Sequence, residues 1–182
     1  MIFTETPLKG ATLVYPQLIT DERGFFARSW CAREFGDHGL ESRLVQCNIS
    51  YSRVKGTLRG MHYQIPPFEE GKLVRCTQGG IHDVIIDLRR DSKSFGKHFG
   101  VTLTAENRTM LYVPKGFAHG FLTLEDDTEV SYQMSEFYAP ACARGIRWND
   151  PSFTIEWPGD VRILSKKDRS YADFDLKKAG TE

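Results

Sequence analysis

Turn residues recur about every eight to twelve positions along most of this chain, and this rhythm constrains the fold more than any other feature. The segments between the turns are short and rich in β-branched and aromatic residues, which pack well on a pleated sheet. Helices connecting parallel strands would need longer segments. The pattern therefore predicts an all-β fold, a sandwich or closed barrel, rather than alternating βαβ units.

We expect one short helix, at residues 32–40, and a series of strands at 11–18, 25–30, 44–52, 56–64, 72–76, 81–88, 98–104, 109–113, 118–124 and 128–135. Pro16 interrupts the first of these strands and places it at a sheet edge, because proline cannot donate a ladder hydrogen bond. No linker or internal repeat is evident, so we expect a single domain over residues 1–182. The polar tail from Ser165 onward can wrap the barrel.

The charge balance excludes several classes of partner. Lys plus Arg (24) equals Asp plus Glu (24), so no overall field attracts nucleic acid or an anionic membrane. No run approaches the roughly 20 apolar residues that span a bilayer, and the N-terminus does not resemble a signal peptide. The four cysteines lack metal-ligand spacing. We expect a cytoplasmic protein with free thiols that binds any anionic ligand through a local basic cluster.

The stretch from Gly56 to Gln64 carries polar side chains where a core strand would be aliphatic. Strict alternation divides its residues between two faces, with Leu58, Gly60, His62 and Gln64 on one and Arg59, Met61 and Tyr63 on the other. Neither face is purely apolar. The stretch alone fits either an edge strand with a solvated histidine or a strand that carries a functional site.

A second histidine lies in the P-x-G-x-x-H spacing of Pro114 to His119, which resembles the later signature of cupin-type jelly rolls. Metal-binding cupins carry an H-x-H pair in the earlier signature, but here only His62 occupies that stretch. Catalytic metal sites need three or four protein ligands, and Glu69 or Glu70 lies beyond a Pro-Pro loop. We therefore expect no metal and no cofactor, and acid–base chemistry on an organic ligand in the barrel mouth.

Strand parity supplies further candidates. Lys72 shares a face with Val74 and Cys76, so it points either into the barrel or, at a strand start, to the surface. Tyr132 should face inward, as a core tyrosine or as a site residue. His82 lies in the most aliphatic strand and is interpreted as structural. Asp168 is a tail carboxylate unless the tail folds back to orient a histidine.

Nine short motifs follow one another over nearly the whole chain. They are D-x-R-G-x-F from Asp21, Q-x-N-x-S from Gln46, G-x-L-R-G-M-H-Y-Q from Gly56, G-K-L-V-R from Gly71, G-F-A-H-G-F from Gly116, Y-x-P from Tyr138, W-x-D-P from Trp148, I-x-W-P from Ile155 and L-S-x-K-D from Leu164. Together and in this order they resemble the dTDP-4-dehydrorhamnose 3,5-epimerase family. The resemblance implies a metal-free cupin, a double-stranded β-helix or jelly-roll barrel with a few short helices. It also implies a homodimer acting on a nucleotide-diphospho-4-keto-6-deoxyhexose.

The resemblance also implies roles for individual residues. His62 would be the base, held by Asp168, with Tyr132 as the proton donor and Lys72 near the keto oxygen. The positions matching substrate contacts are Arg23, Phe26, Gln46, Asn48, Arg59, His119, Tyr138 and Lys167. The chemistry agrees, because a C4 ketone acidifies the hydrogens on C3 and C5, and a neutral imidazole is a suitable base near pH 7.

Two positions depart from the family pattern. Arg28 stands where an acidic residue usually follows the Arg-Gly-x-Phe turn, and Ala143 and Arg144 precede the Gly-Ile-x-Trp motif where another is usual. The exact sugar nucleotide and the number of inverted centres therefore stay open. Alternatives are a single-centre epimerase, a sugar-nucleotide 3,4-ketoisomerase and a non-catalytic sugar-nucleotide-binding barrel.

Overall fold

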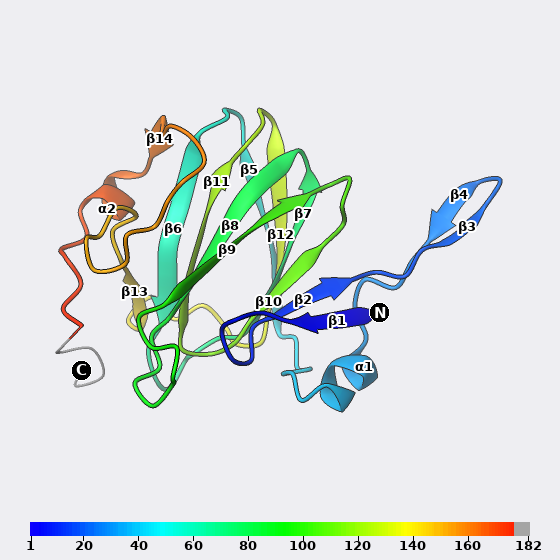
Figure 1. Cartoon of the computed structure of the whole chain (residues 1–182), viewed down its shortest axis with the longest axis horizontal. Helices are drawn as coiled ribbons and strands as arrows, with labels where there is room; N and C mark the ends of the chain where they lie inside the picture. Colours follow the sequence, from blue (N-terminus) through cyan, green and yellow to red (C-terminus); the bar gives the residue numbers. More distant parts are fainter. Residues whose placement is uncertain (177–182) are drawn as a thin grey trace.

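The computed structural model describes residues 1–176 and is built almost entirely from antiparallel strands (Figure 1). The first sheet has six strands, in the spatial order β1 (Ile2–Glu5), β2 (Thr12–Tyr15), β10 (Met110–Val113), β7 (Lys72–Gln78), β12 (Thr128–Met134) and β5 (Gln46–Ser52). The second runs in the order β13 (Ala143–Gly145), β6 (Thr57–Gln64), β11 (Phe117–Thr123), β8 (Gly80–Asp87) and β9 (His98–Thr104), with β14 (Ile163–Leu164) added alongside β6.

The main core lies between the two sheets. Val74 and Val130 from the first sheet pack in one buried cluster with Ile81, Ile85 and Phe121 from the second. Alternate residues of each strand face this cluster, as period-two alternation requires. The all-β jelly-roll expectation is confirmed, and the layered arrangement fixes which side chains meet between the sheets.

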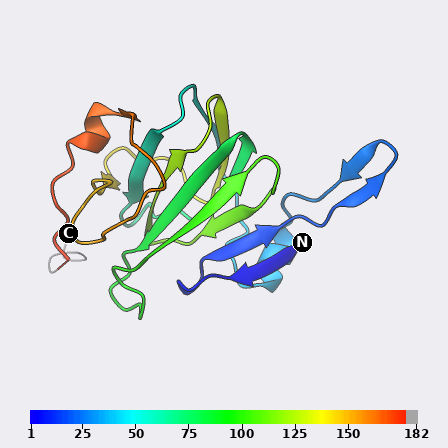
Figure 2. The same ribbon diagram turned by 45° about the horizontal axis from the view of Figure 1, so that its top comes forward.

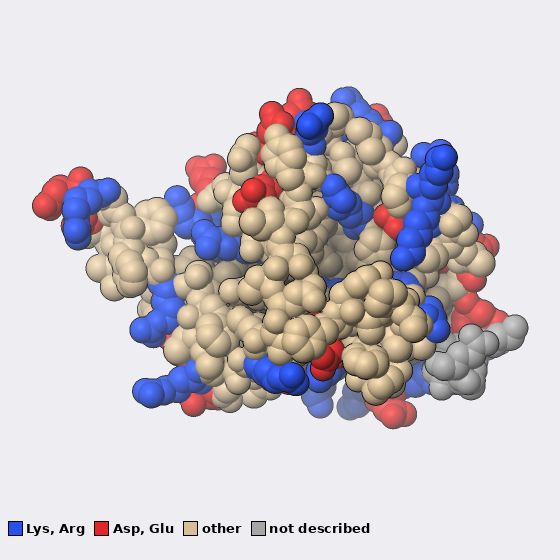
Figure 3. Space-filling model, turned by 180° about the vertical axis from the view of Figure 1, so that it is seen from behind, with Lys and Arg blue, Asp and Glu red and all other residues tan. Residues whose placement is uncertain are grey.

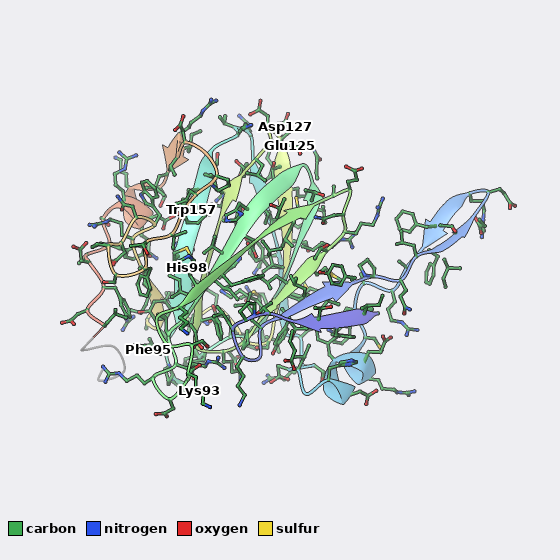
Figure 4. The ribbon with its side chains drawn as sticks, viewed as in Figure 1. Lys93, Phe95, His98, Glu125, Asp127 and Trp157 are labelled. Carbon is green, nitrogen blue, oxygen red and sulfur yellow. The ribbon has the colours of Figure 1, made fainter. Side chains whose placement is uncertain are left out.

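The outer face of the second sheet is covered by the chain that follows β13. Met61, Val84 and Ile86 form a second buried cluster with residues of that segment. Trp157, labelled in Figure 4, meets the ring of His82 edge-on at a centroid distance of 6.2 Å. His82 therefore packs outside the barrel, in agreement with its interpretation as structural.

Several boundaries differ from expectation. The edge assignment of residues 11–18 is wrong, because β2 ends at Tyr15, before Pro16, and the unanticipated β1 pairs on its outer side. The strand expected at 25–30 is only β4 (Gly24–Phe26), which pairs with β3 (Ile19–Asp21). The helix expected at 32–40 is α1 (Ala32–Asp37), and β13, β14 and α2 (Lys166–Arg169) were not anticipated. Short elements lack enough periods for a pattern to be recognised.

Two segments lie at opposite ends of the molecule. The hairpin β3–β4 projects away from the body, as both ribbon views show (Figures 1 and 2). At the opposite end, the tail returns to the second sheet, where β14 pairs in parallel with β6 and α2 follows at once. No helix among residues 1–176 is long and apolar enough to cross a membrane. Residues 177–182, which the single-domain expectation included, lie outside the described part of the chain.

Candidate active site

A β-bulge in β6 resolves the ambiguous faces of the stretch from Gly56 to Gln64. Opposite β6, β11 pairs His119 with His62 and Phe121 with Arg59, so two steps on β11 match three steps on β6. Paired residues of antiparallel strands point to the same side of a sheet. His62 and Arg59 therefore share the inner face, and the strict alternation that separated them is wrong because the bulge inserts one residue.

The bulge is accommodated by two glycines in close contact. A Cβ on Gly60 would lie 2.5 Å from the Cα of Gly120, and Gly60 has a φ of +143°, which L side chains rarely adopt. A Cβ on Gly120 would lie 2.7 Å from Met61 Sδ and 2.8 Å from the Arg59 carbonyl oxygen. The sequence Arg-Gly-Met-His can form this bulge because neither strand has a side chain where Gly60 and Gly120 approach each other.

His62 and Arg59 open onto a cavity of about 310 Å³ between the sheets. The second sheet contributes these two residues and His119, while the first contributes Asn48, Lys72 and Tyr132, and loops add further side chains. The remaining lining residues are Ile49, Ser50, Tyr63, Gln64, Glu70, Phe121, Met134, Tyr138, Ala143, Arg144 and Lys167. Among the lining side chains, Arg59, Lys72, Arg144 and Lys167 are basic and Glu70 is acidic, so the cavity favours an anion although the chain is neutral overall.

His62 is paired with the tail carboxylate that the sequence left undecided. His62 Nε2 lies 2.7 Å from Asp168 Oδ1, and 6% of the Asp168 side chain is exposed against 47% for His62. Burial opposes ionisation of Asp168, but hydrogen bonds from His62 and Ser165 outweigh it and lower the pKa of the carboxyl. A charged acceptor at Nε2 favours the tautomer in which Nε2 carries the proton, leaving the Nδ1 lone pair free.

Lys72 points inward and forms a buried ion pair. Its Nζ lies 3.0 Å from Glu70 Oε1, with 6% of each side chain exposed. Of the two directions that strand parity allowed for Lys72, the structure therefore shows the one into the barrel. A buried ammonium held by a carboxylate is a fixed positive charge in the cavity wall, and its geometry is set by β7 and by the loop before it.

Tyr132 lies on the sheet opposite His62, next to a second histidine–carboxylate pair. Its ring lies 6.0 Å from that of His119, whose Nε2 is 2.7 Å from Asp83 Oδ1. A phenol is protonated at neutral pH, and burial raises the pKa of Tyr132 further, so the cavity wall holds a neutral hydroxyl at this position. The cavity thus has a candidate base in one wall and a candidate acid in the other.

Comparison with known proteins shows the family of the chain. The family model for dTDP-4-dehydrorhamnose 3,5-epimerase matches residues 5–175. The dTDP-4-dehydrorhamnose 3,5-epimerase of Methanothermobacter thermautotrophicus is 45% identical over 172 residues, covering 93% of this chain and 92% of that protein. The chain belongs to the dTDP-4-dehydrorhamnose 3,5-epimerase family.

Two solved structures share the fold and carry ligands. The Bacillus anthracis dTDP-4-dehydrorhamnose 3,5-epimerase with TDP and PPi bound has a TM-score of 0.92, 43% identity, and coverage of 95% of this chain and 99% of that chain. The Legionella pneumophila dTDP-6-deoxy-D-glucose-3,5-epimerase in complex with dTDP-4-keto-L-rhamnose has a TM-score of 0.86, 37% identity, and coverage of 92% and 89%.

Not every anticipated contact residue of this family member lines the main cavity. Gln46 lines an adjoining cavity that shares Asn48 and Tyr138 with the first. Arg23 and Phe26 lie on the projecting hairpin, where 84% of the Arg23 side chain and 73% of Phe26 are exposed. Within one chain, the structure does not bring these two to the cavity.

The two departures from the family pattern have different surroundings. Arg28 Nη1 donates to Glu34 Oε1 at 2.6 Å, so a local acid is its partner. Ala143 and Arg144 line the cavity, and Arg144 donates to the carbonyl oxygens of Ala141 and Ala143. Ala143 and Arg144 therefore contribute to the shape and charge of the cavity itself.

Sequence reasoning did not assign the carboxylates Asp83 and Glu70 to this site. Asp83 had a usable signal, because it alternates with Ile81 and Ile85 on a core-facing strand and a buried carboxylate needs a partner. Glu70 lies in a loop, where parity gives no direction. Among residues 1–176, no three His, Cys, Asp or Glu side chains gather as a metal ion would need, and the four cysteines are free.

Proposed function

We propose that this protein is an isomerase that inverts C3 and C5 of a dTDP-4-keto-6-deoxyhexose of the dTDP-4-keto-6-deoxyglucose type. The observation that carries the proposal is the placement of His62, Lys72 and Tyr132 around one cavity whose walls come from opposite sheets. Membership of the family and the bound ligands named for its relatives support the substrate class.

In the proposed reaction, His62 removes the proton next to the ketone. The hydrogen bond to Asp168 holds the ring and stabilises the imidazolium that forms. The electron pair of the broken C–H bond moves onto the C4 oxygen as an enolate. The ammonium of Lys72, fixed by Glu70, stabilises the charge on that oxygen.

Inversion requires the new proton to arrive from the other face of the sugar ring. Tyr132 is suited to this step because it lies in the wall opposite His62 and a phenol carries its proton at neutral pH. The enolate electron pair forms the new C–H bond with the proton from Tyr132, and the C4 ketone re-forms. The imidazolium of His62 then gives its proton to solvent and the phenolate of Tyr132 takes one back, so both groups are reset for the second centre.

The substrate diphosphate is proposed to lie against the basic side chains of the cavity. Arg59 is oriented by β5, since its Nε donates to Ser52 Oγ at 3.2 Å and its Nη2 to the Tyr51 carbonyl oxygen at 2.9 Å. Asn48, His119, Tyr138 and Lys167 line the same cavity and would complete the contacts. A planar guanidinium is well suited to a diphosphate.

We further propose a homodimer in which the hairpin of one chain reaches the cavity of its partner. The hairpin exposes Ile19, Phe25 and Phe26 behind a charged tip and projects from the body, which it meets where the Arg108 guanidinium lies 4.5 Å from the centroid of the Phe25 ring (Figure 3). Apolar side chains exposed in this way favour a protein contact. Such a contact would bring Arg23 and Phe26 to the substrate, with the Phe26 ring available to stack on the base.

We place the enzyme in the cytoplasm. Four free cysteines agree with a reducing compartment. Residues 1–182 are proposed to act as a single domain.

The test is incubation with dTDP-4-keto-6-deoxyglucose in deuterium oxide, followed by proton NMR of substrate and product. We expect deuterium at both C3 and C5. Exchange at C3 or C5 alone would select a single-centre epimerase, a 3-keto product would select the ketoisomerase, and binding without exchange would overturn catalysis altogether.

A further inference from the structure

Tyr171 occupies the space that a side chain at position 145 would need. A Cβ on Gly145 would lie 2.1 Å from Tyr171 Cζ and 2.2 Å from its Cε2, so the aromatic ring rests directly on the glycine. Gly145 pairs with His62 across β13 and β6. The ring of Tyr171 therefore also meets the ring of His62, edge-on at a centroid distance of 6.4 Å.

This contact lies three residues beyond Asp168, on a segment with little structure of its own. Helix α2 is four residues long, a length that does not persist without tertiary contacts. Before Asp168, β14 anchors the tail to Thr57 and Leu58 of β6, and Ser165 caps α2 by accepting from the Asp168 N–H. After Asp168, Tyr171 on Gly145 is the next contact with the sheet that carries His62.

We propose that Tyr171 is a positioning residue that holds the Asp168 carboxylate against His62. Gly145 makes room for the Tyr171 ring, because it has no side chain. The inference rests on the proposed function, because it assigns Tyr171 a role in presenting the base. Tyr171 itself does not touch the substrate in this account. It fixes the far end of the short helix, so that the carboxylate cannot drift from the Nε2 of His62.

Removing the ring should leave the fold intact, because other contacts hold the tail further on. The Phe174 N–H donates to Asp150 Oδ2 at 2.6 Å, and the Phe174 ring packs on Phe153 at 5.3 Å. These anchors lie on the segment after β13 and not next to the dyad. They keep the tail docked. Asp168 itself is held from the N-terminal side by hydrogen bonds from Ser165 and the Gly60 backbone, and Tyr171 is the contact that holds the C-terminal side of α2.

The ring, rather than the hydroxyl, is assigned the role, since the ring carbons make the closest approach to Gly145. The hydroxyl lies near Lys167, so a hydroxyl-based role is the competing explanation. Tyr171→Phe separates the two, because it keeps the ring and removes the hydroxyl.

The experiment compares Tyr171→Ala, Tyr171→Phe, Gly145→Ala and the double variant Gly145→Ala/Tyr171→Ala by steady-state kinetics on dTDP-4-keto-6-deoxyglucose. Tyr171→Ala should lose about a hundred-fold in kcat with KM within about twofold, as expected for a catalytic group misplaced by about 1 Å. Tyr171→Phe should keep the wild-type kcat, because the ring is retained. Gly145→Ala should lose a similar factor by expelling the ring, and the double variant should be no slower than Tyr171→Ala, because no ring remains to be expelled.

A second readout does not depend on activity. The proton shared by His62 and Asp168 should give a downfield proton NMR signal, identified by its loss in Asp168→Asn. We expect the signal in the wild type and in Tyr171→Phe and its loss in Tyr171→Ala, with thermal unfolding confirming that every variant is folded.

Wild-type kcat and an unchanged signal in Tyr171→Ala would overturn the inference, as would failure of Tyr171→Phe to keep the wild-type kcat. An inactive wild type would overturn the proposed function, and the NMR comparison would still decide whether Tyr171 holds the dyad.

Discussion

The contact between Gly60 and Gly120 predicts that adding one methyl group will damage both stability and catalysis. Gly120→Ala is the cleaner change, because its φ is not in the left-handed region and the effect is steric alone. The new Cβ would meet Met61 Sδ at 2.7 Å and two backbone atoms, the Arg59 carbonyl oxygen and the Gly60 Cα, at 2.8 Å. Backbone atoms cannot rotate away, so β6 and β11 must separate.

The expected cost follows from overpacking. An extra methyl in a tightly packed site costs roughly 1–3 kcal/mol, and about 1 kcal/mol shifts Tm by roughly 2–4 °C in a domain of this size. Gly120→Ala should therefore lower Tm by about 2–12 °C. Gly60→Ala should cost about 1–3 kcal/mol more, because alanine at a φ of +143° is strained.

The assay is thermal unfolding combined with kcat for epimerisation. Gly36→Ala is the matched control, since it lies in α1 with nothing within 4 Å of its added Cβ. Alanine is favoured over glycine in a helix, so the control should raise Tm slightly and keep kcat. Gly120→Ala should reduce kcat as well, because the bulge that places Arg59 beside His62 can no longer close.

A Gly120→Ala protein as stable and as active as the control would refute the reasoning. It would mean that the strands can relax around the methyl group and that the bulge does not depend on two facing glycines.

Three further predictions concern single side chains. Asp168→Asn should lower kcat by about 10²–10⁴-fold with little change in KM, because the ring of His62 loses its charged acceptor, and steady-state kinetics checks this. Glu70→Ala should destabilise the fold by roughly 3–5 kcal/mol in denaturant unfolding, since the ammonium of Lys72 is left buried without its partner, and a loss below 1 kcal/mol would contradict the pairing. Asp87 is fully buried, and although burial opposes its charge, hydrogen bonds from neighbouring side chains lower its pKa from 3.8 to about 2. A carboxyl whose pKa is lower in the folded than in the unfolded protein stabilises the fold at pH values above its unfolded pKa. The free energy of unfolding should therefore fall by about 2 kcal/mol as the pH drops from about 4 to about 2, and this loss should be absent in Asp87→Asn.

The part of the fold that could be predicted is the part that repeats. Strands such as β7 and β12 are long enough for alternation to show. Parity correctly pointed Tyr132 inward, while for Lys72 it left the barrel and the surface open, and the structure places Lys72 in the cavity wall. Short elements such as β13 and α2 carry no such signal. They owe their structure to tertiary contacts, as the contact of Tyr171 with Gly145 illustrates.

Most of the side chains that the sequence singled out line the cavity, but their arrangement could not be predicted. The motifs marked His62 and Arg59, yet alternation separated them, because a bulge is a property of two strands and not of one. The pairing of His62 with Asp168 spans 106 positions in the sequence and followed from resemblance alone. Arg23 and Phe26 lie away from the cavity of their own chain. We propose that they contact the cavity of a second copy, which the sequence of one chain cannot show.

We propose that His62, which shares the inner face with Arg59 because of the bulge, removes the proton beside the ketone. The most direct measurement is deuterium incorporation at C3 and C5 of dTDP-4-keto-6-deoxyglucose by wild type and His62→Ala, at equal concentrations of folded protein. We expect exchange at both carbons with the wild type and at neither with His62→Ala. Exchange by His62→Ala at a rate near that of the wild type would contradict it.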